Sequence, residues 1–276
     1  MKVGIITNAY EVPRIRSLVD YLERKAEVRL YIEEEFLFDY QALSFDENVF
    51  FTKGKGYILL TIARLAEEYG KPRGVVVVND ARSVWIAMHR FMHFTIVRKA
   101  GVRVPDFGLG QKAPKHFGKF IAKNIIDQNH LRNLDILPFV GESGDEVPTI
   151  GTGEEAGEDP RVRQFHLFQR FVESEYEYKV YGFGDRLFYY RQIPVLENPR
   201  KMETRVPIDE IPELKRMSIL AMKATGLLVT SMDFLYENRK FYLTDINAIP
   251  NFNYLPQGPE MLGDYLLDLA KGGGGK

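Results

Sequence analysis

The sequence predicts a mixed α/β fold with two parts: a small parallel sheet at the N-terminus and an antiparallel sheet backed by helices towards the C-terminus. Residues 1–83 alternate between apolar strand patterns (2–7, 28–32 and 74–79) and amphipathic helix patterns (12–26 and 57–69). This β-α-β-α-β order favours parallel strands, because parallel neighbours need a crossover helix. From residue 165 onward, strand patterns follow one another across short turns such as Gly184-Asp185, which favours antiparallel hairpins.

The composition excludes several classes of protein. The chain has 276 residues, of which 45% are hydrophobic and 27% charged, with a net charge of -1 and no cysteine. A disulfide framework and a thiolate metal site are therefore excluded. No apolar run approaches the ~20 residues of a membrane span, and the balanced charge argues against a nucleic-acid partner. We expect a cytoplasmic enzyme that binds neither nucleic acid nor membrane, and we leave a homodimer open.

Residues 233–250 predict a β-hairpin that carries oxygen ligands. Met232–Tyr236 forms one strand, 237–240 a polar turn and 241–246 the second strand. Because side chains alternate along a strand, Asp245 and Asn247 point to the same face, and Asp233 can lie beside them. Two carboxylates and an amide oxygen suit Mg²⁺. The hairpin therefore predicts a metal site, with an ordinary polar strand end as the alternative.

Two further segments carry candidate chemistry. A helix is expected at 81–100, ended by Gly101 at its C-cap. The strand pattern at 120–126 then contains a lysine, Lys123, among apolar neighbours, which is costly unless an anion meets the ammonium. The alternative is that Lys123 lies on a solvent face. Helices are also expected at 208–226 and 259–270. Residues 141–160 are rich in Gly and acidic residues, which indicates a loop, either a lid or a solvated insertion.

Taken in order, these features resemble the ATP-grasp superfamily over about residues 79–257, together with the α/β domain that precedes them. Asn79-Asp80, Arg90 and the segment 100–105 look like the first helix of that family, and Phe120-Ile-Ala-Lys123 looks like its lysine strand. Residues 168–172 look like its hinge strand. Glu177-Tyr-Lys179, followed by Gly184-Asp185, resembles a motif of the RimK-type ligases.

The resemblance implies an ATP-grasp fold and a set of site residues. Its cofactors are ATP and Mg²⁺, or Mn²⁺ in place of Mg²⁺. The residues expected to bind the nucleotide are Arg90, Lys123, Gln169, Phe171, Val172, Glu177 and Lys179. The residues expected to act in catalysis are Arg191 and Lys179, with Arg191 facing the γ-phosphoryl group. The expected metal ligands are Asp233, Asp245 and Asn247. The expected domains are 1–83, 84–166 (with the loop 141–160), 167–270 and a flexible tail at 271–276.

We expect transfer of the ATP γ-phosphoryl group to a small acceptor, with a carboxylate–amine ligase acting through an acyl phosphate as the first hypothesis. A kinase of the inositol-phosphate type is the alternative, because Tyr178-Lys179-Val-Tyr181 and Asp245-Ile-Asn-Ala248 are similar to that branch. Residues 142–159 carry seven acidic side chains and no basic one, which disfavours a polyanionic acceptor. A nucleotide-binding module without turnover is the third hypothesis.

Overall fold

The computed structural model describes residues 1–35, 44–127, 139–145, 147, 165–194 and 201–272. These residues form a mixed α/β fold, as the sequence predicts. Their internal contacts divide the chain into two compact units. Unit 1 comprises residues 1–85, 226–230 and 248–276, and unit 2 comprises residues 86–225 and 231–247. The chain thus passes between the units four times, whereas the sequence analysis expects domains that are continuous in sequence. Most of the expected loop 141–160 lies outside the described residues.

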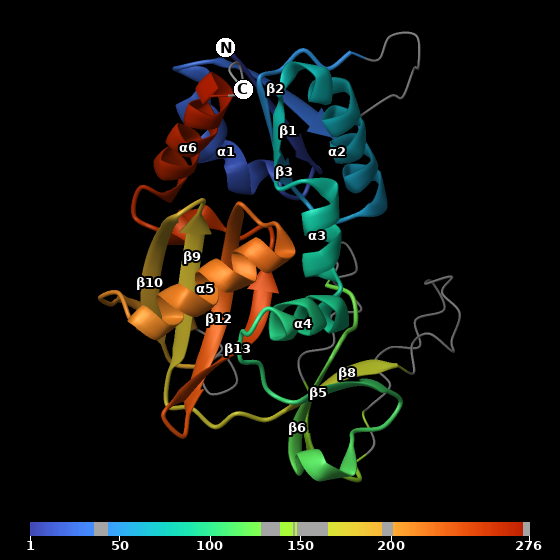
Figure 1. Ribbon diagram of the computed structural model, residues 1–276. Coiled ribbons are helices and arrows are strands. Elements are labelled where there is room, and N and C mark those ends of the chain that lie inside the picture. Colours follow the sequence, from blue (N-terminus) through green and yellow to red (C-terminus); the bar gives the residue numbers. More distant parts are fainter. Residues whose placement is uncertain (36–43, 128–138, 146, 148–164, 195–200, 273–276) are drawn as a thin grey trace. The chain divides into compact units, whose positions relative to one another are not determined.

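Unit 1 is built on a parallel sheet with the strand order β2-β1-β3-β4. Its strands are β1 (Lys2–Thr7), β2 (Glu27–Ile32), β3 (Val49–Lys53) and β4 (Val76–Val78). Its helices are α1 (Val12–Glu23), α2 (Tyr57–Gly70) and α6 (Gly258–Gly272), and α3 (Ala81–Met88) begins in it. The apolar side of α2, including Leu59 and Ile62, packs on Ile6 and Phe50 of the sheet. Figure 1 shows α2 on one face of this sheet and α1 with α6 on the other.

One strand of this sheet is not predicted from the sequence. Three parallel strands are expected, but β3 inserts between β1 and β4. All five residues of β3 are buried, including the polar Thr52 and Lys53. A run of only three apolar residues, Val49 to Phe51, followed by two buried polar ones, gives too short a pattern to distinguish a buried strand from a loop.

The closing helix, expected to back the antiparallel sheet, belongs to unit 1 instead. Helix α6 lies against α1, where Gly263 leaves room for the ring of Tyr21. The Tyr21 hydroxyl donates to Asp264 Oδ1 at 2.6 Å. The apolar face of α6, with Leu262 and Leu266 fully buried, therefore packs on the parallel sheet. Periodicity predicts that a helix has an apolar face but not which sheet covers it.

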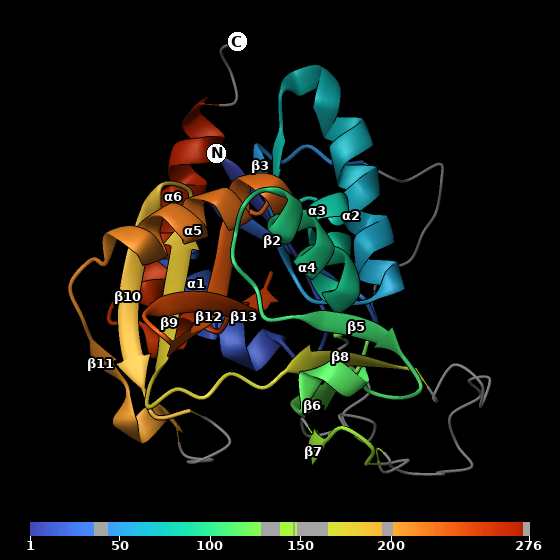
Figure 2. The same ribbon diagram turned by 60° about the horizontal axis from the view of Figure 1, so that its bottom comes forward.

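Unit 2 contains a five-stranded sheet with the order β11-β10-β9-β12-β13. Its strands are β9 (Glu177–Phe183), β10 (Arg186–Gln192), β11 (Val206–Pro207), β12 (Val229–Glu237, which begins in unit 1) and β13 (Lys240–Asn247). Strands β9 to β11 are successively antiparallel, and β12 and β13 form the predicted hairpin. Figure 2 shows helix α5 (Pro212–Thr225) lying across β9, β10 and β12. Gly182 of β9 lets Met222 of α5 approach the strand.

A second, four-stranded sheet of unit 2 is antiparallel and has the order β5-β8-β6-β7. Its strands are β5 (Phe107–Gly110), β6 (Lys119–Lys123), β7 (Phe139–Glu142) and β8 (His166–Arg170). Phe117, Phe120, Ala122 and Phe168 form the core on one face. Ile121, Lys123, Leu167 and Gln169 therefore occupy the opposite face, since side chains alternate along each strand.

The helix expected at 81–100 is interrupted. It consists of α3, ending at Met88, and α4 (Arg90–Lys99), with His89 extended between them. His89 pairs with Ile126 in an isolated antiparallel bridge, and the Arg90 N–H donates to Ile125 O at 2.9 Å. Pairing with the segment after β6 satisfies backbone groups that a continuous helix would use internally. None of the helices in the described ranges has both the length and the apolar character needed to cross a membrane.

Candidate active site

The β12–β13 hairpin places the three predicted metal ligands on one face. Asp233 lies directly opposite Asp245 in the register, and Ser231 lies opposite Asn247. The two-residue turn at Asn238 and Arg239, both with positive φ, matches the twist of the two strands. The prediction that these oxygen-bearing side chains share a face of one hairpin agrees with this register.

A β-bulge lies between these ligands and the turn. Asp233 pairs with Asp245, but the next residue, Phe234, pairs with Leu243, so Thr244 is the extra residue of β13. The Thr244 carbonyl accepts a hydrogen bond from Lys123 Nζ at 2.9 Å. The Thr244 hydroxyl donates to Asp233 O at 3.1 Å. The bulge therefore brings the ammonium of the lysine strand next to the carboxylates of the hairpin, within unit 2.

Each carboxylate has a basic neighbour. Lys179 Nζ donates to Asp233 Oδ1, and Arg90 Nε lies 3.8 Å from Asp245 Oδ1. Burial disfavours the charge on Lys179, but Asp233, Tyr181 and Glu177 together outweigh burial, and the pKa of Lys179 is raised. Burial lowers the pKa of Lys123, and Asp245 opposes that shift. Like charges directly opposite in a sheet repel, and the neighbouring cations offset the repulsion between these two carboxylates.

The donor set fits a hard divalent cation. Asp233 and Asp245 supply carboxylate oxygens with side-chain exposures of 15% and 31%, and Asn247 can supply an amide oxygen. Within the described ranges, no group of three His, Cys, Asp or Glu side chains could hold a metal ion. A site with two carboxylates and one amide is typical of Mg²⁺, which completes its octahedron with water and phosphate oxygens. These residues therefore fit Mg²⁺.

A hydrogen-bonded network lies on the same face of the antiparallel sheet. Glu177, Lys179 and Tyr181 alternate along β9 and share this face with Gln192 of β10. The Gln192 amide donates to Glu177 Oε1. Arg205 donates from Nε to Gln192 Oε1 at 2.7 Å and from Nη1 to the Tyr181 hydroxyl at 2.9 Å. Two neutral partners thus orient the Arg205 guanidinium on the face that carries Lys179. Arg205 is not among the residues predicted from the sequence.

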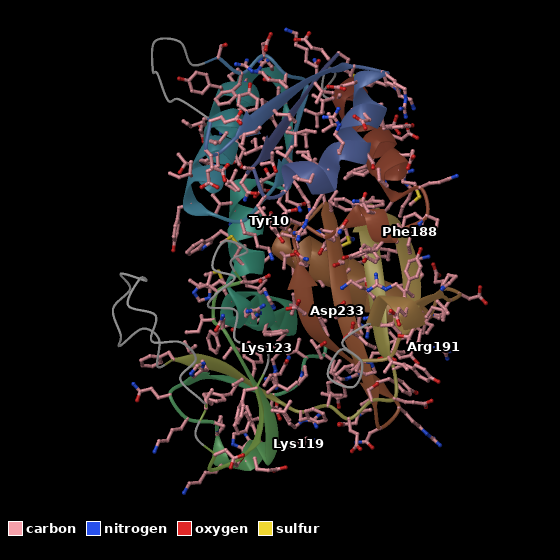
Figure 3. All side chains as sticks on the ribbon, turned by 180° about the vertical axis from the view of Figure 1, so that it is seen from behind. Tyr10, Lys119, Lys123, Phe188, Arg191 and Asp233 are labelled. Atoms are coloured by element: carbon pink, nitrogen blue, oxygen red, sulfur yellow. The ribbon has the colours of Figure 1, made fainter. Side chains whose placement is uncertain are left out.

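The structure does not bring Arg191 to that face. In the β9–β10 register, Arg191 pairs with Tyr178, and Lys179 pairs with Tyr190. Since paired residues share a face and successive residues alternate, Arg191 lies on the opposite side of the sheet from Lys179. Its guanidinium stacks on the ring of Tyr176, 4.2 Å from the centroid. Figure 3 shows Arg191, which belongs to β10, apart from Lys123 and Asp233.

The predicted hinge residues differ in what they can offer a ligand. Gln169 is 1% exposed, and neither atom of its amide has a hydrogen-bond partner among the described residues. It lies on the face of β8 that also carries Lys123 on the neighbouring strand. The Phe171 N–H already donates to Lys119 O at 2.9 Å, and its carbonyl accepts from Arg170. Val172 is buried, at 3% exposure.

A buried histidine lies on α4 in this unit. His93 is 0% exposed, its Nδ1 lies 2.9 Å from Ala87 O, and its ring packs edge-on against Phe94. Burial lowers the pKa of His93 to about 4, although Asp245 acts in the opposite direction. The folded protein therefore keeps this imidazole neutral, with the Nδ1 proton donated to the Ala87 carbonyl.

This lowered pKa predicts a loss of stability in mild acid. An unfolded histidine binds a proton below about pH 6.5, whereas folded His93 resists protonation down to about pH 4. The stability contribution is present above pH 6.5 and is lost as the pH falls through this window. We expect His93 to account for about 2 kcal/mol of the decrease in unfolding free energy between pH 7 and pH 5.

Urea unfolding at both pH values should show a smaller decrease in unfolding free energy for His93→Gln than for the parent protein. The exposed control His116→Gln should retain the full decrease, and equal decreases in both variants would contradict this assignment.

Comparisons with known proteins identify the fold. No protein-family model matches the sequence, and no curated protein matches it. Among solved structures, the chain is similar to the ATP-grasp ligase PsnB, with a TM-score of 0.71 and 15% identity over 97% of both chains. PsnB is seen in complexes with a precursor peptide and AMPPNP, and with a minimal precursor, Mg, and ADP.

Two further solved structures show the same likeness. One is a RimK domain ATP-grasp protein from Sphaerobacter thermophilus, with a TM-score of 0.68 and 13% identity over 97% of this chain and 100% of that chain. The other is the D-cycloserine synthetase DcsG, with a TM-score of 0.65 and 11% identity over 98% of this chain and 100% of that chain. The chain therefore has the ATP-grasp fold.

Proposed function

We propose that this protein is a Mg-ATP-dependent carboxylate–amine ligase that acts through an acyl phosphate. The observation that supports this most is the arrangement around the bulge. Opposed carboxylates at Asp233 and Asp245 lie on one hairpin, and Lys123 reaches the carbonyl of the adjacent bulge residue, Thr244. Phosphoryl transfer depends on positioning and charge neutralisation, and this arrangement supplies both.

The metal and the phosphates would share this face. Asp233, Asp245 and Asn247 would hold Mg²⁺, which supplies charge neutralisation at the phosphate oxygens during transfer. Lys123 and Arg90 would contact the phosphates from the other sheet and from α4. Lys179, now paired with Asp233, would bind phosphate as a point charge once Asp233 turns to the cation. The charged groups around this hairpin in unit 2, together with the Asn247 amide, support these roles.

Gln169 supports the nucleotide assignment. A fully buried amide without a partner costs about 1–3 kcal/mol for each unsatisfied group, so a ligand at this position would recover hydrogen bonds. An amide can both donate to and accept from the edge of adenine. We propose that Gln169 and the main chain of Val172 recognise the base, while the Phe171 N–H stays in its bond to Lys119.

Arg205 supports a carboxylate acceptor. Its guanidinium is held on the face of Lys179 by Gln192 and Tyr181, and the planar fork of arginine suits a carboxylate or an acyl phosphate. In the proposed reaction, the acceptor carboxylate oxygen forms a bond to the γ-phosphorus, and the bond from that phosphorus to the β–γ bridging oxygen breaks. The amine then displaces phosphate. Glu177, on the same face, would accept the ribose hydroxyls.

A product assay tests this proposal against its two alternatives. ADP and free phosphate are measured together, with Mg²⁺ or Mn²⁺, in a screen of small carboxylates and amines and of peptides. A ligase releases one phosphate for each ADP, and both require the two co-substrates. ADP without free phosphate would instead support a kinase, because the phosphate stays on the product. Calorimetric binding of ATP without any turnover across the screen would support a silent nucleotide-binding module.

A further inference from the structure

Asn79, at the carboxyl end of β4, is a buried asparagine whose amide makes four hydrogen bonds. The side chain is 0% exposed. Its Oδ1 accepts from Leu228 N at 2.8 Å and Val229 N at 2.9 Å. Its Nδ2 donates to Val229 O at 2.6 Å and Ala248 O at 2.8 Å. An amide side chain offers two donors and an acceptor with two lone pairs, so every hydrogen-bonding position of Asn79 is used.

The partners of Asn79 are the two ends of the hairpin that carries the proposed metal ligands. Val229 is the first residue of β12, four residues before Asp233. Ala248 follows Asn247 directly. The last pair in the hairpin register is Ser231 with Asn247. By bonding Val229 and Ala248 to a single side chain, Asn79 holds the strands together beyond that pair.

Lys53, at the end of β3, holds the next two carbonyls of the same segment. Its Nζ donates to Ile249 O at 2.6 Å and to Pro250 O at 2.9 Å. Its side chain is 3% exposed, and Glu11 Oε2, 3.5 Å away, provides a negative charge. Three consecutive carbonyls after Asn247 are thus held by buried side chains of unit 1, two of them by Lys53.

We propose that Asn79 is a positioning residue for the metal site, with Lys53 in a supporting role. Ends of strands fray unless something fixes them, and Asn247 is the last residue of its strand. Without the Asn79 bonds, the terminal pair would open and the Asn247 amide would no longer stay on the face of Asp245. The parallel sheet therefore acts on metal binding through the main chain of the hairpin. This inference rests on the proposed function of the hairpin.

The test is calorimetric and does not depend on turnover. The Asn79→Asp variant keeps the shape and both accepted hydrogen bonds but loses both donors. Binding of AMPPNP to the full chain is titrated with saturating Mg²⁺ and again with EDTA. We expect Asn79→Asp to weaken Mg²⁺-dependent binding about tenfold, which corresponds to about 1.4 kcal/mol. Binding in EDTA should change less than about twofold, since the nucleotide contacts are elsewhere.

Asn8→Ala is the matched control, because Asn8 is also a fully buried asparagine of unit 1 and accepts a local bond from Glu11 N. An equal Mg²⁺ dependence in Asn79→Asp and this control would overturn the inference. If Asn79→Asp does not fold, Lys53→Met is compared with the control in the same way, by the Mg²⁺ dependence of AMPPNP binding. Glu11 is not left without a cation in Lys53→Met, because it keeps its ion pair with Arg14 at 2.9 Å. Asp245→Ala separates a failure of the proposed metal site from a failure of the proposed role of Asn79. If Asp245→Ala does not alter Mg²⁺-dependent binding, the proposed metal site itself is wrong. If Asp245→Ala removes that binding and Asn79→Asp does not weaken it, only the role of Asn79 is wrong.

Discussion

Replacing Asp245 with alanine is expected to lower ATP turnover by at least about 1000-fold, which corresponds to about 4 kcal/mol of lost transition-state stabilisation. Asp245 is one of two opposed carboxylates proposed to hold Mg²⁺, and Arg90 and Lys123 lie beside it. Without it, two cations remain next to a metal site that has lost half of its negative charge. The side chain is 31% exposed, so its removal leaves no buried cavity and the fold should persist.

Steady-state release of ADP at saturating ATP measures this effect, and circular dichroism checks the fold. Asp268→Ala is the control, because Asp268 is an exposed carboxylate on α6, paired only loosely with Lys271 at 3.5 Å. It should retain the turnover of the parent protein. Unchanged turnover in a folded Asp245→Ala protein would remove the metal site from the proposal.

Arg191 and Arg205, which lie at the five-stranded sheet, are expected to respond very differently to replacement by lysine. Arg205→Lys should lower kcat/KM for the acceptor by about 100-fold, because a hydrogen bond to a charged group contributes about 1.5–3 kcal/mol. Lysine cannot reproduce the Nε contact to Gln192 together with the bidentate fork. Arg191→Lys should stay within about threefold, because only stacking on Tyr176 is weakened.

This pair is an internal control, since Arg191 lies on β10, Arg205 directly precedes the paired strand β11, and both undergo the same chemical change. The measurement is kcat and KM for ATP and for the acceptor, obtained separately. The opposite ranking, with Arg191 essential and Arg205 dispensable, would restore Arg191 to the catalytic role that the sequence analysis assigns to it.

The β12–β13 hairpin could be predicted from the sequence because its signal is local. A polar turn between two apolar strands and a period of two put Asp245 and Asn247 on one face without any knowledge of the remaining chain. The bulge at Thr244 could not be predicted, because it depends on how β12 and β13 pair. Without it, the contact of Lys123 with this hairpin could only be inferred from resemblance.

The face of the sheet on which Arg191 lies follows from the turn that precedes β10. A two-residue turn at Gly184-Asp185 pairs Phe183 with Arg186, and this register puts Arg191 opposite Tyr178. The turn alone therefore places Arg191 and Lys179 on different faces. Arg205 is different in kind. It follows a long connection after β10, and it is brought to Gln192 by a strand of only two residues, β11. No periodicity can be read from so short a strand.

The bulge at Thr244 also determines which substitutions position 244 can accept. Because Lys123 contacts a backbone carbonyl, the contact does not depend on the side chain at that position. A substitution at residue 244 can therefore keep the lysine contact, although it removes the hydrogen bond from the Thr244 hydroxyl to Asp233 O unless the new residue is serine. Deleting one residue from β13 would have a different consequence. If the deleted residue were Thr244, Asp233 would still lie opposite Asp245 in a regular ladder, but the bulge whose carbonyl Lys123 contacts would be lost. The lysine contact thus constrains the number of residues in β13, whereas the hydroxyl bond constrains the amino acid at position 244.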